Sequence, residues 1–249
     1  MKGFDVSGFL DNLVNTFLLE GVFVTVWLTV VSLAGGLVLG LCIALLRSSR
    51  RPALSAFARF YTWVFRGTPL LIQLIVIYAG LPQVGLKLSV TGAALTGLIL
   101  HEAAYISEIV RGGFMSVAKG QWDAGKALGV PRSLTLFMII LPQAFRTMLP
   151  ALGNQVNGLL KATSITSVIS MEELMRNSET LMQVKFDVLE VYMAAAVYYL
   201  ALTTLWDALQ RLMERRMERP YRNAHVETTS TAPGRAPKAI NVAAEGGAA

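Results

Sequence analysis

The sequence is short of the residues on which soluble domains and metal sites depend. Only 15% of its 249 residues are charged, whereas a soluble domain usually has about 25%. Its single cysteine, Cys42, can form no internal disulfide and excludes a CxxC metal site. The two histidines, His101 and His225, argue against a histidine-rich metal centre. We therefore expect no metal site in this chain.

What the sequence has instead is apolar residues, 54% of the total, and a net charge of +6. A positive charge can indicate nucleic-acid binding. Here, however, lysine and arginine stand mostly in short segments between apolar runs, which is the pattern of membrane topology. The composition predicts an all-α, polytopic membrane protein in contact with lipid and without a nucleic-acid partner.

Five apolar segments are candidates for membrane spans. Gly21 to Leu46 contains no charged residue and exceeds the ~20 residues that cross a bilayer, so it is too long for a signal-peptide core. The other four expected spans are Gly67 to Leu86, 88–110, 148–171 and Val191 to Trp206. Pro69 removes a helical hydrogen bond from the second of the five spans, so we expect a kink there. The apolar run from Ser133 to Leu141 is too short to span.

The distribution of positive charge predicts the orientation. If the first span ends in the cytoplasm, the inner side carries Arg47, Arg50, Arg51, Arg111, Lys119, Lys126, Arg132, Arg146, Arg211, Arg215, Arg216, Arg219 and Arg222. The outer side then carries only Lys2, Lys87, Arg176 and Lys185. We therefore expect a periplasmic N-terminal segment, 1–16, a transmembrane domain, 17–219, and a disordered cytoplasmic tail, 220–249.

The segment between the third and fourth spans is charged and interrupted. Trp122 to Leu128 has good helix formers, with Asp123 expected in the first turn, where it suits the helix dipole. Gly129 can adopt the left-handed conformation that ends a helix, and Pro131 can open the next helix, which we expect to end near Pro142. The pattern predicts two short helices with a sharp turn, within a loop at 113–142.

This loop also contains a near match to a phosphate-binding loop. Residues 120–127 read GQWDAGKA, close to G-x-x-x-x-G-K-[ST]. Ala127 lacks the hydroxyl that would bind Mg²⁺, and Asp123 would face the phosphates with a negative charge. A membrane span, not a buried strand, precedes the segment. We expect no nucleotide site here.

The same loop carries a family signature. Asp123-Ala124-Gly125, Gly129, Ile139 and Leu141-Pro142 have the spacing of the Glu-Ala-Ala signature, and the loop resembles that of permease subunits of ABC importers. Aspartate keeps the charge of the family's glutamate. Gly125 departs from the second alanine and weakens the local helix by about 1 kcal/mol.

Further motifs resemble one branch of that family, the polar amino acid importers (HisM/GlnP-like permeases). They are RGTP at 66–69, AAYISEIVRGG at 103–113, KGQWDA at 119–124, LPQAFR at 141–146 and KATSI at 161–165. The similarity extends from about Thr16 to Arg219. It implies a MetI-like, type I importer permease fold in the bacterial inner membrane.

The resemblance also implies partners and a mechanism. In the family, the short loop helix is a coupling helix that docks on a separate ATPase, which is present in two copies and binds the ATP and Mg²⁺. A second permease subunit, the same or paralogous, and a solute-binding protein complete the importer. The residues we assign to ATPase coupling are Trp122, Asp123, Ala124, Gly125, Leu128, Gly129 and Pro142. This chain would then be a transport subunit, not an enzyme.

Polar residues inside the expected spans are candidates for the substrate path. Asn154, Asn157, Lys161 and Ser164 recur at steps of three and four on the fourth span, so we expect them on one helix face. Lys161 could pair with Glu102 or Glu108 of the third span. The full set of candidates is Gln73, Glu102, Tyr105, Asn154, Asn157, Lys161, Thr163 and Ser164. The alternative is that these groups only hold helices together.

Other interpretations of the sequence remain open. An ion-coupled carrier could use His101, Glu102, Glu108 and Lys161 as a proton relay, although five spans give no inverted repeat. A membrane scaffold without transport is a third possibility. The KATSI form resembles permeases for basic amino acids and opines, but Ala162 offers no carboxylate to a cationic substrate.

Overall fold

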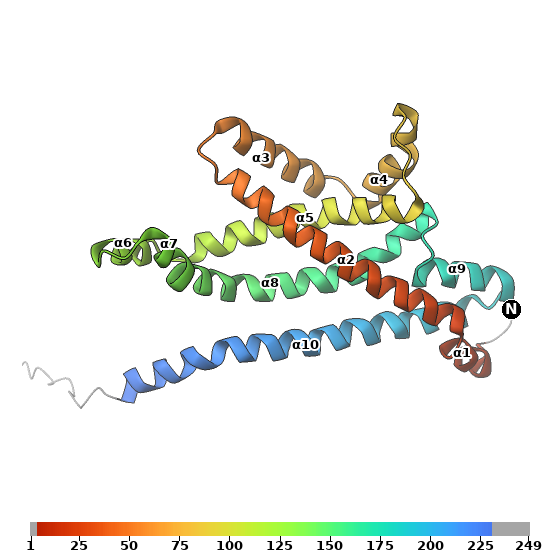
Figure 1. Cartoon of the computed structure of the whole chain (residues 1–249). Helices are drawn as coiled ribbons and strands as arrows, with labels where there is room; N and C mark the ends of the chain where they lie inside the picture. Colours follow the sequence, from red (N-terminus) through yellow and green to blue (C-terminus); the bar gives the residue numbers. More distant parts are fainter. Residues whose placement is uncertain (1–3, 231–249) are drawn as a thin grey trace, which may run out of the picture.

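The protein is a bundle of long helices, shown in a computed structural model that describes residues 4–230, with the backbone alone for 218–230. All regular structure within these residues is helical (Figure 1). The elements are α1 (Val6–Leu13), α2 (Thr16–Arg47), α3 (Pro52–Gly67), α4 (Leu70–Ile75), η1 (Val76–Gly80), η2 (Leu81–Val84), α5 (Val90–Ser116), α6 (Lys119–Ala127), α7 (Arg132–Thr135), η3 (Leu136–Ile140), α8 (Leu141–Ala162), η4 (Thr163–Ile169), α9 (Leu174–Lys185) and α10 (Val188–Ser230).

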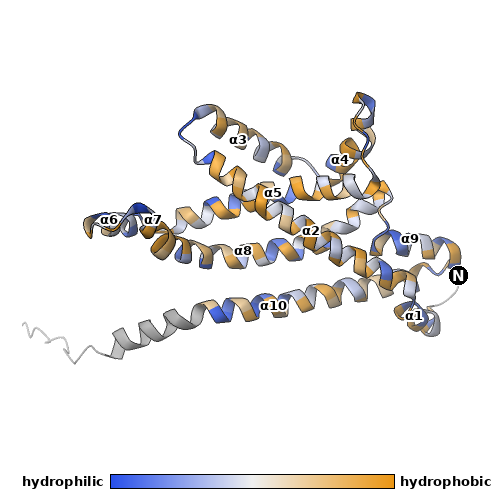
Figure 2. Cartoon of the chain, in the orientation of Figure 1, coloured by the Kyte–Doolittle hydropathy of each residue, from blue (hydrophilic) through white to orange (hydrophobic). Residues whose placement is uncertain are grey.

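Among residues 4–230, four helical stretches are long and apolar enough to cross a membrane: Thr16–Arg47, Val90–Ser116, Arg132–Ile169 and Val188–Met217. A fifth span results if α3 and the segment Leu70–Val84 count as one, with a bend of 106° between them. Apolar residues run along all these helices (Figure 2). The predicted all-α, polytopic fold class is therefore confirmed.

Two of the expected spans begin or end at residues other than those predicted. The second was expected at Gly67 to Leu86, but its helix starts at Pro52 and breaks at Thr68 and Pro69. The break is the kink that Pro69 predicts, because proline cannot donate the helical hydrogen bond. The fourth was expected at 148–171 but belongs to one helical stretch from Arg132 to Ile169. The run Ser133 to Leu141, too short to span by itself, forms the first part of that stretch.

A widened π-helical turn lets that stretch continue past a proline. In η3, the N–H of Leu141 donates to the carbonyl of Leu136, five residues back, and Pro142 follows. The same arrangement occurs in η1, where Leu81 donates to Val76 and Pro82 follows. A proline lacks the N–H and clashes with the carbonyl four residues before it, so an α-helical turn is disfavoured there. Single π turns are rare and often occur at functional sites.

Close packing of α2 on α5 forms the centre of the bundle. A Cβ atom on Gly36 would lie 2.8 Å from Cβ of Glu102, and one on Gly40 would lie 3.0 Å from the carbonyl oxygen of Ala103. Glycine is therefore required for this approach of the two backbones. Small residues at such spacing are typical of tightly packed membrane helices.

The end of the bundle that holds α1 and α9 lies opposite α6 and α7 (Figure 1). There, the fully buried Glu173 caps α9 by accepting from the N–H groups of Met175 and Arg176, at 3.0 and 2.9 Å. It also accepts from the hydroxyl of Tyr199, at 2.9 Å. Burial raises the pKa of the Glu173 carboxyl above its usual range. These contacts fix α9 against α10.

The predicted disordered tail begins inside a helix. α10 continues to Ser230, so the backbone of residues 220–230 is helical, while disorder of the tail stays a prediction. Low hydrophobicity favours disorder in a free segment, but a helix can extend from a packed span into water. The remainder, 231–249, lies outside the described residues.

The α2–α5 contact makes a testable prediction. We expect Gly40→Leu to lower the midpoint of thermal unfolding in detergent, because overpacking a closed helix contact costs about 1–3 kcal/mol or more. Gly112→Leu, at an exposed position of α5 with open space around it, is the matched control. Equal midpoints for the two variants would contradict the role given to Gly40.

Candidate functional site

The loop between α5 and α8 forms the predicted pair of short helices. Gly129 has a φ of +70°, the left-handed conformation expected from the sequence. The N–H of Val130 donates to the carbonyl of Gly125 at 2.9 Å, which closes the end of α6 as in a Schellman motif. α6 begins at Lys119, earlier than expected, so Asp123 lies in its second turn and not in its first.

Gly125, the departure from the family signature, is the buried residue of α6. A Cβ atom there would lie 2.7 and 2.8 Å from Oγ1 and Cγ2 of Thr135 on α7. Thr135 is itself buried, and its hydroxyl donates to the carbonyl of Pro131. The glycine thus allows α6 and α7 to approach closely, which the local helix propensity alone does not show.

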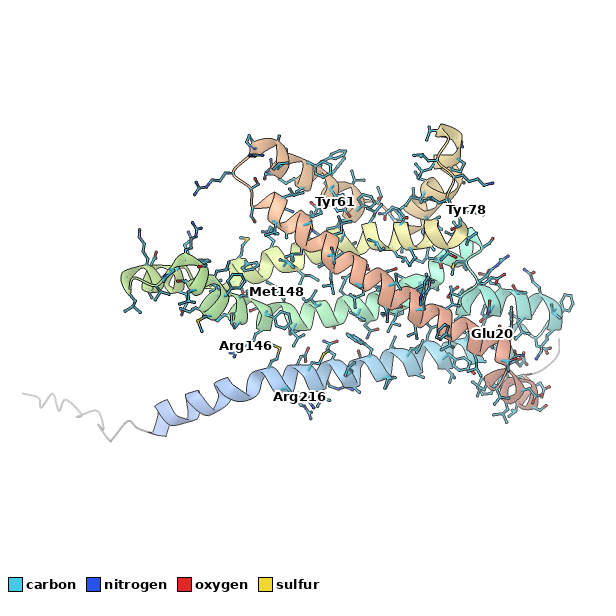
Figure 3. All side chains as sticks on the ribbon, in the orientation of Figure 1. Glu20, Tyr61, Tyr78, Arg146, Met148 and Arg216 are labelled. Carbon is cyan, nitrogen blue, oxygen red and sulfur yellow. The ribbon has the colours of Figure 1, made fainter. Side chains whose placement is uncertain are left out.

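Trp122 fixes α6 to the rest of the bundle. Its partly buried ring packs against the apolar cluster of Val117, Ile140, Ala144 and Met148. Figure 3 labels Met148 on α8; its side chain fills the space beside Gly113 of α5. The guanidinium of Arg132 lies 5.8 Å from the Trp122 ring centroid. Much of the ring, expected to contact a partner, therefore serves contacts within the chain.

The other face of α6 is exposed. Asp123 and Ala124 are exposed, and the side chain of Leu128 is 80% exposed. A groove of about 670 Å³ lies beside them, lined by Trp122, Asp123, Lys126, Gly129, Val130, Arg132 and Thr135. Pro142, also exposed, lies in the first turn of α8 and not in this groove.

One face of α8 is exposed and made of small and polar residues. It consists of Thr147, Ala151, Asn154, Gly158 and Lys161, which recur at steps of three and four. Gly158 has open space around it. We call these five residues the polar face of α8. In a membrane span, such a face suits water or a protein neighbour better than lipid.

Asn157 does not belong to the polar face. This corrects the prediction that it shares one helix face with Asn154 and Lys161. Its side-chain amide donates to Asp207 of α10 at 2.7 Å. Nearby, the indole N–H of Trp206 donates to the carbonyl of Gly153 at 2.8 Å. Asn157 thus helps to join α8 to α10, because its helical position points about 60° away from that of Asn154.

Gln73 and Thr163 are buried and do not line an open surface of this chain. The amide of Gln73 donates to the carbonyls of Phe65 and Thr68, at 2.9 and 3.0 Å, and satisfies backbone groups freed by the break at Pro69. Its oxygen lies 3.1 Å from Nδ1 of His101. Thr163 donates to the carbonyl of Leu160 within its own turn. Ser164, partly exposed, donates likewise to the carbonyl of Lys161.

The expected ion pair of Lys161 with a carboxylate of α5 is wrong. Glu102 is buried and accepts from the amide of Gln155 at 2.9 and 3.1 Å. Glu108 pairs with Arg47 and Arg111 near the α6 end of the bundle. Lys161 is exposed on the polar face, where neither carboxylate reaches it. The two glutamates therefore hold α5 to its neighbours.

Of the two substrate-path candidates on α5, Glu102 and Tyr105, Tyr105 is the partly exposed one. Its ring lies 4.9 Å from that of His101 and 5.3 Å from the guanidinium of Arg66. Among the residues that the structure describes, no group of His, Cys, Asp and Glu could hold a metal ion.

Two partners of the intramembrane polar groups, Gln155 and Asp207, were not expected from the sequence. Gln155 ends the segment LPALGNQ at 149–155, which contains the candidate Asn154. Asp207 follows the expected end of the fifth span by one residue. A signal therefore existed for both, since each is a polar residue in or beside a span.

The contact of Gly125 with Thr135 can be tested by a pair of substitutions. We expect Gly125→Ala to loosen α6 from α7, because Thr135 leaves no room for the methyl group. Gly125→Ala combined with Thr135→Ala should restore the packing. Protease cleavage in the loop measures the effect, with faster cleavage for the single variant alone. If Gly125→Ala is cleaved at the wild-type rate, the close contact is not needed.

Comparison with known proteins shows the family to which this chain belongs. Residues 36–219 match the family described as "Binding-protein-dependent transport system inner membrane component". The chain is 39% identical over 203 residues to the glutamine transport system permease protein GlnP of Escherichia coli (strain K12), covering 81% of this chain and 93% of that protein. It is 37% identical over 203 residues, with the same coverage, to the arginine transport system permease protein ArtQ of Bacillus subtilis (strain 168).

Solved structures agree with this result. A crystal structure of an amino acid ABC transporter with histidines superposes with a TM-score of 0.77 at 35% identity, covering 81% of this chain and 94% of that one. An inward-facing MetNI methionine ABC transporter gives a TM-score of 0.68 at 20% identity, covers 81% of this chain and 96% of that one, and supports the fold alone. The motif resemblance is thereby confirmed: the chain belongs to the inner membrane component family of binding-protein-dependent transport systems, as a permease of the polar amino acid ABC importers.

Proposed function

We propose that this chain carries a polar amino acid across the membrane by alternating access, driven by a separate ATPase that docks on residues 120–130. The proposal rests on the way in which α6 is held in the bundle. It is fixed to the bundle through Gly125 and Trp122, while Asp123 and Leu128 are exposed for a partner. A helix held in this way can transmit movement of the ATPase to the membrane helices, whereas a flexible loop cannot.

The route from α6 into the membrane is a continuous helical stretch. α7, η3 and α8 follow one another without a break and lead to the polar face of α8. In the proposed cycle, ATP binding closes the ATPase subunits and moves α6. Movement of α8 then opens the path to the outer side, and ATP hydrolysis resets it. The π turn at η3 is a place where such a helix can change its winding.

The proposed assembly has two ATPase subunits and a second permease, a copy or a paralogue of this chain. A solute-binding protein delivers substrate on the side of α1. The excess of positive charge near α6 supports an N-terminus outside and a cytoplasmic C-terminus in a bacterial inner membrane. ATP and Mg²⁺ belong to the ATPase, and this chain contributes no catalytic group.

The polar face of α8 supports a polar amino acid as substrate. Asn154 offers an amide and Lys161 a positive charge, which suits the substrate carboxylate. The face carries no carboxylate of its own that would bind a cationic side chain. Relatives are named for glutamine and for arginine. We propose that the choice between such substrates lies mostly with the binding protein.

Substitutions at Gly129 test the coupling. The measurement is amino acid uptake into proteoliposomes that hold the complete transporter, with ATP but no ion gradient. We expect Gly129→Val to lose most uptake, because a left-handed conformation costs a non-glycine residue about 1–2 kcal/mol and a β-branched one more. Gly129→Asn should keep most of it, since asparagine tolerates that conformation.

Two outcomes would contradict the coupling role. Equal uptake by the valine and asparagine variants would show that the turn is not needed. Uptake that requires an ion gradient and ignores ATP would instead support the ion-coupled carrier.

A bulky side chain on the polar face tests the path. We expect Gly158→Phe to abolish uptake while the ATPase still copurifies, because the ring fills the space beside Asn154 and Lys161. Leu205→Phe, at an exposed apolar position of α10, is the matched control and should transport normally. Normal uptake by the Gly158 variant would place the path elsewhere.

A further inference from the structure

The first helix of the chain has three distinct sides. Phe9 and Leu13 of α1 pack against the buried cluster of Leu18, Leu174, Ala194 and Ala195. Val6, Leu10 and Val14 recur every four residues and are 60%, 55% and 72% exposed. Ser7 and Asp11 are exposed on the adjacent strip. The helix is thus apolar where it packs and along one neighbouring exposed side, and polar beyond that.

Specific hydrogen bonds hold α1 in this orientation. The N–H of Asp5 donates to Glu190 of α10 at 2.8 Å, and the hydroxyl of Tyr198 donates to the carbonyl of Leu13. The ammonium of Lys185 donates to the buried Asn12 at 2.7 Å. With both of its ends bonded, α1 cannot roll to bury its exposed apolar side.

A second apolar group lies on the segment that bonds to α1. The last residues of α9 and the two that follow them, 184–187, which we call the α9–α10 turn, expose Val184 and Phe186 by 74% and 82%. Lys185, which stands between them, is the residue that reaches Asn12. Directly after this turn, Val188 and Leu189 open the membrane-spanning part of α10 and are themselves exposed.

The exposed side of α10 supports lipid as the neighbour of this region. From its start to Leu209, its large exposed residues are all apolar: Val188, Leu189, Met193, Val197, Leu200, Leu205 and Leu209. An apolar surface of this length on a spanning helix suits lipid chains. The apolar residues of the turn continue this surface past the end of the span, to the level of α1.

We propose that α1 and the α9–α10 turn form an interfacial anchor, lying in the lipid headgroup region at the end of the bundle opposite α6. The apolar side of α1 (Val6, Leu10 and Val14) and the turn residues Val184 and Phe186 enter the boundary of the acyl chains. Ser7 and Asp11 face water, and the ammonium of Lys185 stays bonded to Asn12 of α1. The anchor sets the depth of the first turns of α2 and α10 in the membrane.

Spin labels on neighbouring residues test this inference. In a Cys42→Ser background, which removes the sole native cysteine, Leu10→Cys and Asp11→Cys are labelled with a nitroxide. The transporter is reconstituted in nanodiscs of phosphatidylethanolamine and phosphatidylglycerol. We expect the label at position 10 to collide more with oxygen than with a water-soluble nickel chelate, and the label at position 11 to show the reverse. A label at Phe186→Cys should behave like position 10.

Every other result would overturn the anchor. Preference for the nickel chelate at position 10 would mean that this side faces water. Protection of position 10 from both reagents would mean that a protein, either a second copy or a binding protein, covers it. Preference for oxygen at both positions would mean that the helix is sunk in lipid and has no polar side. All three labelled positions are exposed in the fold, and thermal unfolding of each labelled protein verifies that it is intact.

Discussion

The proposed coupling to an ATPase depends on the close packing of α6 onto α7. The hydrogen bond from Val130 to Gly125, made possible by the left-handed Gly129, turns the chain sharply. The missing side chain at Gly125 then lets Thr135 pack directly against α6. Without this closure, a partner's movement would bend the loop and would not reach α8.

The polar groups within the membrane helices are of two kinds: those that join helices and those that are exposed on α8. Glu102, Gln73 and Asn157 each form a hydrogen bond with another group of the chain, which lowers the cost of placing them inside the membrane part. They join α5, α4 and α8 to their neighbours. What remains exposed is a short stripe on α8, including Asn154 and Lys161. The proposed path is therefore smaller than the number of intramembrane polar residues suggests.

Features set by neighbouring residues in the chain were predictable from sequence. The apolar runs indicated the spans, Pro69 indicated the break of the second, and Gly129 indicated the turn after α6. Each depends on an interaction within a few residues: burial of a run, a missing N–H, or a permitted φ. The Asp-Ala-Gly signature and its companion motifs likewise indicated the family, because they are short local patterns.

Features set by packing between distant segments were not predictable. The spacing of three residues predicted that Asn157 shares a face with Asn154, but the rotation of about 60° between them lets Asn157 bond to Asp207 of α10. Gln155, not Lys161, reaches Glu102, because the rotation of α8 against α5 is fixed by the whole bundle. The fourth span began earlier than predicted because η3 carries the helix past Pro142. The two partners, Asp207 and Gln155, are far in sequence from the groups that they bind.

The proposed function depends above all on the binding of an ATPase to α6. The most direct measurement is the labelling rate of Leu128→Cys, in the Cys42→Ser background, with a water-soluble maleimide. The account predicts fast labelling of the isolated permease and strong protection when the ATPase is bound, since this side chain is 80% exposed in the chain alone. Equal rates with and without the ATPase would contradict it.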